Sequence, residues 1–143
     1  MLSPSLEDYL EEVYRLSQHS HTVRVTDISN KLNVTLPSVT KAFQKLRDQH
    51  CIIYQPYGEI VLTDQGRELG SFLVQRNQLL QEFLELICSK CDIAAEAEAM
   101  EHYLSRATIV AIQSLVTFMK TNPDCYHNFL FFLENPVSDL TQF

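Results

Sequence analysis

Apolar residues recur at helical spacing up to about residue 50 of the chain. A first apolar stripe covers residues 6–16 and follows Ser3 and Pro4, which suit the N-cap and the first position of a helix. Two shorter helices are predicted next, over residues 28–33 and from residue 35 to about residue 49. Because only a short turn joins these two helices, the pattern predicts a helix-turn-helix.

The pattern changes after residue 50. Residues 51–54 and 59–62 are strand candidates, and the turn Gln55-Pro56-Tyr57-Gly58 lies between them, so the pair predicts a β-hairpin. Helical periodicity then returns and continues almost to the end of the chain. The predicted fold class is therefore mainly α. An N-terminal winged helix-turn-helix, made of three helices and a two-stranded hairpin, covers residues 1–70, and an all-helical domain covers residues 71–143.

The basic residues of this acidic chain gather in the predicted helix-turn-helix. The net charge is −7, yet residues 24–50 hold five Lys and Arg against two Asp. Such side chains bind phosphates and base edges when a helix enters the major groove. The third helix alone would equally fit a solvated surface, but the hairpin that follows it favours binding to double-stranded DNA. The predicted DNA-binding residues are Arg24, Thr35, Pro37, Ser38, Thr40, Lys41, Gln44, Lys45, Arg47 and, at the hairpin tip, Tyr57.

Composition and simple motifs exclude several classes of protein. The chain is 45% hydrophobic and 20% charged, as in ordinary globular domains. No apolar run approaches the ~18 residues that span a bilayer, and residues 1–4 do not open a secretory signal. We therefore expect a cytoplasmic protein without a membrane partner, with reduced cysteines. Neither a Gly-rich phosphate loop nor a nucleophile elbow is present, so an enzyme is not expected.

Two predicted helices carry carboxylates that could bind a divalent cation. On the first helix, Asp8 and Glu11 lie together opposite the apolar stripe. On the helix predicted over roughly residues 92–104, Glu98 lies three residues before Glu101 and four before His102, so the three share one face. Each group alone would also fit a solvated acidic surface. Oxygen donors with one imidazole suit Mn²⁺ or Fe²⁺ better than a metal that prefers thiolates.

Asn77 interrupts the apolar stripe of the long helix that follows the hairpin. It lies four residues after Leu73 and three before Leu80. A polar side chain at such a position either satisfies a local hydrogen bond or is presented to a site. The sequence leaves both interpretations open.

Four stretches of the chain together resemble the diphtheria toxin repressor family, in its short manganese-responsive form without a third domain. They are residues 4–14, 37–46, 61–66 and 98–105, within a similarity that covers about residues 3–120. The resemblance implies a homodimer that binds operator DNA when a metal occupies the joint between its domains, and that represses genes for metal importers. Mn²⁺ is the expected metal, with Fe²⁺ or another divalent cation as alternatives. The ligands that the resemblance implies are Asp8, Glu11, Glu98, Glu101 and His102.

Asn77 departs from the family pattern, which has a histidine at this position. An asparagine offers its amide oxygen, a weaker and harder donor than imidazole. Three outcomes are open: looser binding with a stronger preference for oxygen-loving ions, loss of one metal from a two-metal site, or a degenerate metal site. The aromatic segment over residues 126–133 also differs from the family, and suggests extra packing at the dimer interface.

A winged-helix regulator with a degenerate metal site is the alternative function. Such a protein would respond to redox state or to another ligand, and Cys88-Ser89-Lys90-Cys91 has the spacing of a dithiol motif. We favour the simpler interpretation of two small residues near a helix end. Cys51 and Cys125 are expected to be structural.

Overall fold

The computed structural model describes residues 2–20, 22–55 and 58–135, and it divides into two compact units. The first unit is Met1–Gln78 and the second is Leu79–Phe143. The predicted turn residues Pro56 and Tyr57 lie outside the described residues, as does the end of the chain after residue 135.

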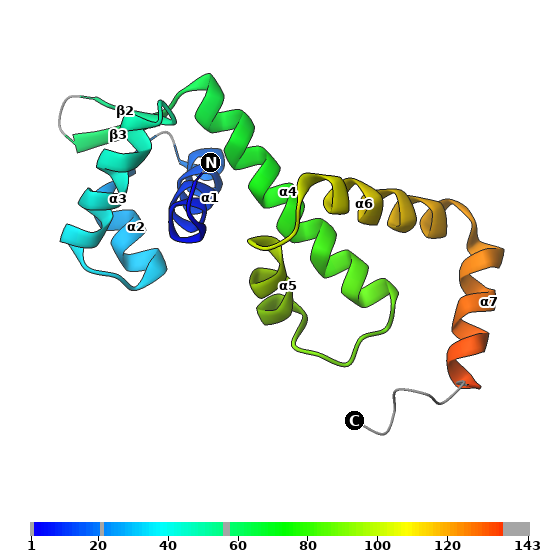
Figure 1. Ribbon diagram of the computed structural model, residues 1–143. Helices are drawn as coiled ribbons and strands as arrows, with labels where there is room; N and C mark the ends of the chain where they lie inside the picture. The colour runs from blue at the N-terminus through cyan, green and yellow to red at the C-terminus, as the bar shows by residue number, and fades with distance from the viewer. Residues whose placement is uncertain (1, 21, 56–57, 136–143) are drawn as a thin grey trace. The chain divides into compact units, whose positions relative to one another are not determined.

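The first unit holds three helices, a small sheet and the start of a long helix (Figure 1). Its first helix begins where the sequence predicts, because the Ser3 hydroxyl accepts a hydrogen bond from the Leu6 amide and Pro4 occupies the first turn. The elements of this unit are α1 (Pro4–His19), β1 (Val23–Arg24), α2 (Val25–Leu32), α3 (Leu36–Asp48), β2 (Ile52–Tyr54), β3 (Glu59–Leu62) and the first part of α4 (Asp64–Leu86).

The predicted hairpin is confirmed, and the sheet has a third strand that the sequence pattern missed. The strand order is β1-β3-β2, and both neighbours pair antiparallel with β3. In β1, Val23 lies opposite Ile60 and Arg24 opposite Glu59. A two-residue strand is too short to show alternation. Since the backbone of Arg24 also donates to Asp27 at 2.9 Å, α2 begins directly after β1, slightly earlier than predicted.

The core of the first unit lies between α1, α2, α3 and the inner face of the sheet. The side chains of Leu10, Val13, Ile28, Phe43 and Ile52 have no exposed surface. Full burial of such a side chain stabilises the fold by about 1.5–3 kcal/mol. These residues come from the stripes and strands that the sequence pattern singled out, so the winged helix-turn-helix is confirmed.

The start of α4 packs tightly against the segment between α3 and β2. The Thr63 hydroxyl accepts from the Gly66 amide at 3.0 Å and donates to the His50 carbonyl at 2.5 Å. A Cβ atom on Gly66 would lie 1.9 Å from the Cys51 carbonyl oxygen. Only glycine fits at this position, because the opposing atom belongs to the backbone.

The second unit is entirely helical in its described part, as predicted. Its core contains Leu80 and Leu84 of α4, Ala97 of the next helix and Ile109 of the one after. No helix in the described part of the chain is long and apolar enough to cross a membrane. The helices that follow α4 are α5 (Ile93–Glu101), α6 (Arg106–Thr121) and α7 (Pro123–Glu134).

Candidate DNA-binding helix and metal centre

The second helix of the helix-turn-helix, α3, has one buried and one exposed face. The Thr35 side chain caps it by accepting from the Ser38 amide at 3.3 Å. Val39, Phe43 and Leu46 are completely buried in the core of the first unit. The opposite face of the helix is therefore open to a partner.

The exposed face of α3 carries the polar residues that the sequence analysis selected. The side chains of Lys41, Gln44 and Lys45 are exposed and form no ion pair or hydrogen bond with any residue that the structure describes. The Thr40 hydroxyl donates instead to the Leu36 carbonyl at 3.0 Å. Long donors that are not engaged within the protein are available for phosphates and base edges.

The remaining predicted DNA-binding residues have different surroundings. Arg47 lies 3.5 Å from Asp48 and 5.9 Å above the Tyr54 ring, so its guanidinium is partly engaged on the protein surface. Arg24 pairs with Glu59 across the sheet, with 3.6 Å between the nitrogen and oxygen atoms. The Thr35 and Ser38 hydroxyls are 2.8 Å apart, while Pro37 is exposed. Tyr57 falls outside the described residues.

A shallow groove of about 500 Å³ runs along the exposed side of α3. One of its lining residues, Leu36, was missed by the sequence analysis because its apolar side chain extends the buried stripe of the helix. The residues that line the groove are Leu36, Pro37, Ser38, Thr40, Lys41 and Gln44.

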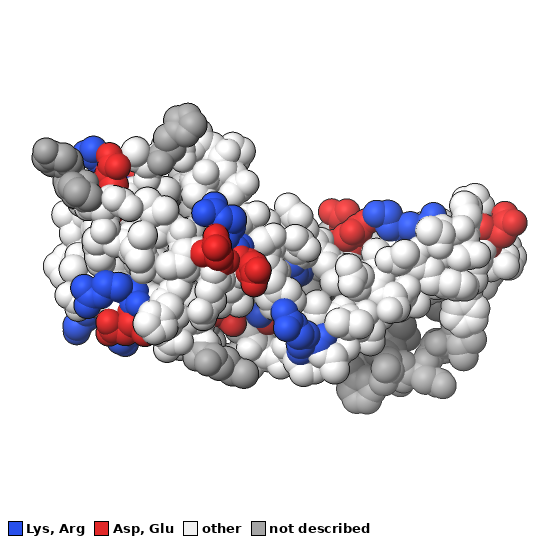
Figure 2. Space-filling model, turned by 90° about the horizontal axis from the view of Figure 1, so that it is seen from above, with Lys and Arg blue, Asp and Glu red and all other residues white. Residues whose placement is uncertain are grey.

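The basic side chains form small groups on the molecular surface. In the view of Figure 2, Lys and Arg groups are separated by uncharged surface and mostly adjoin Asp or Glu. The face in this view therefore offers no continuous basic surface. The side chains of Lys41 and Lys45 on α3 give this helix local positive charge that can attract DNA.

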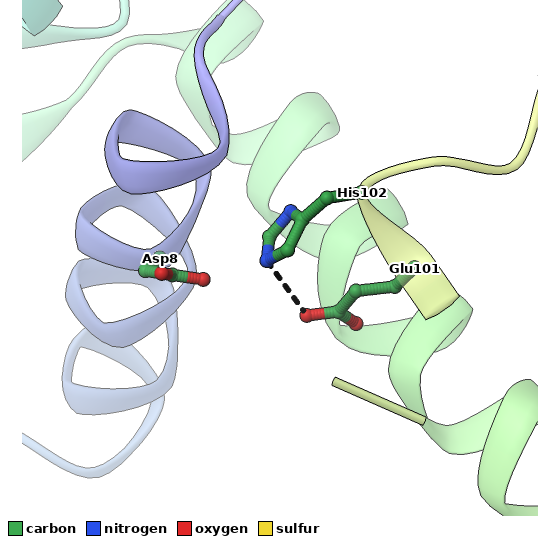
Figure 3. A group of neighbouring side chains, drawn as sticks. All are labelled: Asp8, Glu101 and His102. Atoms are coloured by element: carbon green, nitrogen blue, oxygen red, sulfur yellow. Dashed lines mark ion pairs between the residues drawn. The ribbon is translucent and has the colours of Figure 1, made fainter. Parts of the chain in front are cut away.

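The candidate metal centre is best defined at the C-terminal end of α5. The imidazole of His102 is turned toward the carboxylate of Glu101, with 3.6 Å between Nε2 and Oε1 (Figure 3). Glu101 is 1% exposed, and His102 is the C-cap residue of the helix. Glu98, one turn earlier, is exposed. The predicted helix was expected to continue to residue 104, but α5 ends at Glu101, which places the imidazole just beyond the helix end.

Helix α1 of the first unit carries acidic side chains of its own. Figure 3 shows Asp8 projecting from this helix. Glu11 is 6% exposed, and its Oε1 atom lies 2.6 Å from Arg15. The same guanidinium lies 3.8 Å from Glu12. Arg15 thus neutralises part of the negative charge on α1.

Two neighbouring residues of α4 are buried polar groups. Asn77 is 8% exposed, as its place on the apolar stripe predicts. Arg76 is 6% exposed and donates to the Glu7 carboxylate at 2.8 Å, while its guanidinium lies 5.9 Å from the Phe72 ring centre. The ion pair fastens α1 to α4 within the first unit.

The donors of these groups fit a hard divalent cation. Asp8 and Glu101 offer carboxylate oxygens, and His102 offers an imidazole nitrogen. Oxygen-rich sets with one nitrogen suit Mn²⁺ or Fe²⁺, whereas thiolate-rich sets select softer metals.

Among the described residues, no cysteine belongs to a group of neighbouring side chains that could hold a metal ion. Burial raises the pKa of the Cys51 thiol, which keeps it protonated and fits a structural role. Cys88 is exposed and has a positive φ of 59° where α4 ends, and Cys91 is half-buried. The Tyr126 hydroxyl donates to the Leu86 carbonyl at 2.9 Å, and burial together with the neighbouring Cys88 thiol raises the pKa of Tyr126.

Comparison with known families identifies both halves of the chain. Residues 1–60 match the model of the iron dependent repressor N-terminal DNA binding domain. Residues 63–129 match the iron dependent repressor metal binding and dimerisation domain. The chain therefore belongs to the iron-dependent repressor family, and it is a transcription regulator rather than an enzyme. The family resemblance inferred from the sequence is confirmed.

Among individual relatives, the chain is similar to the HTH-type transcriptional regulator MntR. It is 41% identical to MntR of Lysinibacillus sphaericus over 125 residues, which cover 87% of this chain and 90% of the relative. It is also 41% identical to MntR of Geobacillus kaustophilus over 121 residues, covering 84% and 86% of the two chains.

Solved structures show the same fold. The manganese regulator SloR matches with a TM-score of 0.71 and 26% identity, covering 82% of this chain and 55% of SloR. A manganese-dependent transcriptional repressor in complex with manganese matches with a TM-score of 0.69 and 26% identity, covering 79% and 53%. This chain spans about half the length of these two solved proteins.

Proposed function

We propose that this protein is a cytoplasmic, Mn²⁺-responsive repressor that binds double-stranded operator DNA as a homodimer and controls genes for metal-ion uptake. The observation that carries the proposal is the Glu101–His102 pair at the end of α5, within the half of the chain that matches a metal-binding domain. The manganese-dependent relatives and the oxygen-rich donors favour Mn²⁺, with Fe²⁺ as the alternative metal.

The proposed metal ligands come from three helices. Family resemblance and donor chemistry support carboxylates of α1, an amide of α4, and carboxylates and an imidazole of α5. To reach a bound ion, the Glu98 carboxylate would have to turn away from solvent. The Glu11 carboxylate would have to turn away from Arg15. The proposed set is Asp8, Glu11, Asn77, Glu98, Glu101 and His102.

A bound cation supplies positive charge that carboxylates from both units can share. In the proposed site without a metal, the carboxylates of Asp8 and Glu11 would repel those of Glu98 and Glu101. The Arg15 guanidinium, which pairs with Glu11, would offset this repulsion only in part. α1 is packed into the same core as α3, so a restraint on α1 also restrains the recognition helix. We therefore expect metal binding to reduce the number of conformations that the protein samples, and to raise the fraction of molecules in the conformation that binds DNA.

The dimer and the DNA surface are proposed to lie on different elements. Apolar side chains exposed on α6, including Val110 and Phe118, suit contact with a second copy of the chain. The exposed face of α3 would enter the major groove in each half of a palindromic operator. A two-fold symmetric dimer places two such helices on two half-sites.

DNA-binding anisotropy at fixed salt tests the proposal. A labelled palindromic operator duplex, selected from a random library, is titrated with the protein in chelator and then in Mn²⁺, Fe²⁺, Zn²⁺ or Ca²⁺. We expect Mn²⁺ to tighten binding about tenfold or more. Glu101→Gln and His102→Ala should remove this gain, whereas Glu96→Gln, an exposed carboxylate on the same helix, should retain it. Equal affinity with every metal and with chelator would contradict the proposal.

A redox-responsive regulator is the second candidate. The observation that favours it is the exposed Cys88, three residues before Cys91. Thiol alkylation separates the two functions, because it should leave a carboxylate-based response to Mn²⁺ intact and abolish a response carried by thiols.

A further inference from the structure

Leu36 is an exposed apolar side chain at the first position of α3. Its side chain is 47% exposed, although its spacing from Val39 and Phe43 continues the buried stripe of the helix. Val39 and Phe43 have no exposed surface. The core of the first unit therefore covers α3 only from Val39 onward. The N-terminal turn of the helix, which includes Leu36, extends outside the core.

The polar groups around Leu36 are largely engaged with one another. The Thr35 and Ser38 hydroxyls lie 2.8 Å apart, and the Thr40 hydroxyl donates to the Leu36 carbonyl at 3.0 Å. The Leu36 side chain thus forms one wall of the groove along α3, with Lys41 and Gln44 farther along it. The groove combines an apolar end with one cationic and one amide side chain.

We propose that Leu36 is a specificity-determining residue that packs against the 5-methyl group of a thymine in the operator. This inference rests on the proposed function, in which α3 is the recognition helix. The N-terminal residues of such a helix contact base edges in the major groove. The thymine methyl is the apolar group among the four bases at that edge, and Lys41 supplies charge complementary to the nearby phosphates.

Replacing thymine by deoxyuridine tests this contact, because it removes the methyl group and keeps the base pair. The operator is first selected from a random duplex library with the full chain and Mn²⁺. Each thymine is then replaced in turn, and affinity is measured by anisotropy at fixed salt. We expect one position to weaken binding about fourfold in each half-site, the factor that corresponds to about 0.8 kcal/mol for one buried methyl.

A double-mutant cycle assigns the methyl contact to its protein partner. In Leu36→Ala, thymine and deoxyuridine operators should bind equally at that position. Ile53→Ala is the matched control, since Ile53 is 46% exposed in the same unit, and it should keep the fourfold preference for thymine. Leu36 lies outside the hydrophobic core, so its variant should fold normally.

The outcomes separate this inference from the proposed function. Metal-dependent, sequence-specific binding with no thymine methyl effect, or with an effect that persists in Leu36→Ala, overturns the role of Leu36 alone. Dissociation of the dimer by Leu36→Ala with an unchanged methyl effect would place Leu36 in a protein interface and also overturn it. Failure to select any duplex, with or without metal, contradicts both proposals.

Discussion

Arg15 pairs with Glu11, one of the carboxylates of α1 that the proposed site would use. Its guanidinium lies 2.6 Å from Glu11 and 3.8 Å from Glu12, and its own side chain is 40% exposed. An exposed arginine in such a pair contributes little to stability, but it competes with any cation for the same oxygen.

The Arg15→Ala variant should therefore bind Mn²⁺ more tightly, by about two- to fourfold. Titration of the purified protein with Mn²⁺, followed by the paramagnetic resonance of the free ion, measures the affinity. Arg24→Ala is the control, since Arg24 pairs with Glu59 of the sheet rather than with α1. Unchanged or weaker affinity in Arg15→Ala would show that Glu11 is not a ligand.

Asn77 is the proposed ligand that departs from the family pattern. It is 8% exposed on α4. If its amide oxygen binds the metal, Asn77→Ala should weaken Mn²⁺ binding by at least about tenfold. The same titration, with Gln78→Ala as the exposed neighbour for control, checks this. Equal affinity in the two variants would mean that Asn77 has only a local structural role.

Single-residue contacts differ in how far the sequence predicts them. The Arg15–Glu11 pair follows from a spacing of four residues on one helix. The Arg76–Glu7 pair joins positions that are 69 residues apart and emerges only when α1 packs on α4. Leu36 continues the spacing of Val39 and Phe43 yet is 47% exposed, because periodicity does not show where the core ends along a helix.

At the level of elements, Gly66 allows the start of α4 to pack closely against the segment between α3 and β2. A Cβ atom there would lie 1.9 Å from the Cys51 carbonyl oxygen, and the backbone cannot yield as a flexible side chain would. Gly66→Ala should lower the free energy of unfolding by about 3 kcal/mol. Urea denaturation compares it with Glu68→Ala, which is exposed on the same helix. A loss below about 0.5 kcal/mol would show that the two segments are packed less tightly than described.

Most elements of this chain could be predicted because they are long or have strong caps. Ser3, Thr35, Asp92 and Ser105 each accept a hydrogen bond from a backbone amide in the first turn of their helix. Strand β1 could not be predicted, since two residues carry no alternation and their partner strand lies far along the chain. The end of α5 was predicted three residues too late, because no Gly or Asn follows Glu101 to indicate a helix end in the sequence.

At the scale of the whole molecule, α6 carries the surface proposed for dimerisation. Val110 and Phe118 are eight residues apart on one side of the helix and are 53% and 50% exposed. Val110→Glu combined with Phe118→Glu should raise the dissociation constant of the dimer at least about a hundredfold. Sedimentation velocity measures it, with Gln113→Glu, an exposed position farther round the same helix, as control. A double variant that remains dimeric would place the interface elsewhere.

The sequence predicts two domains and their order, but its periodicity does not predict that both domains bind the same metal ion. The acidic faces of α1 and α5 are each visible as spacing along a helix. Whether they serve one ion depends on how the units meet, which periodicity does not encode. The family resemblance added the expectation that both faces bind the same ion.

The most direct test of metal-controlled DNA binding is the Mn²⁺ affinity of the protein with and without its operator duplex, at fixed salt. Linkage requires that DNA tighten Mn²⁺ binding by the same factor by which Mn²⁺ tightens DNA binding, about tenfold or more. We predict this matched increase, and we predict its loss in His102→Ala. An Mn²⁺ affinity that is the same with and without operator would contradict the account.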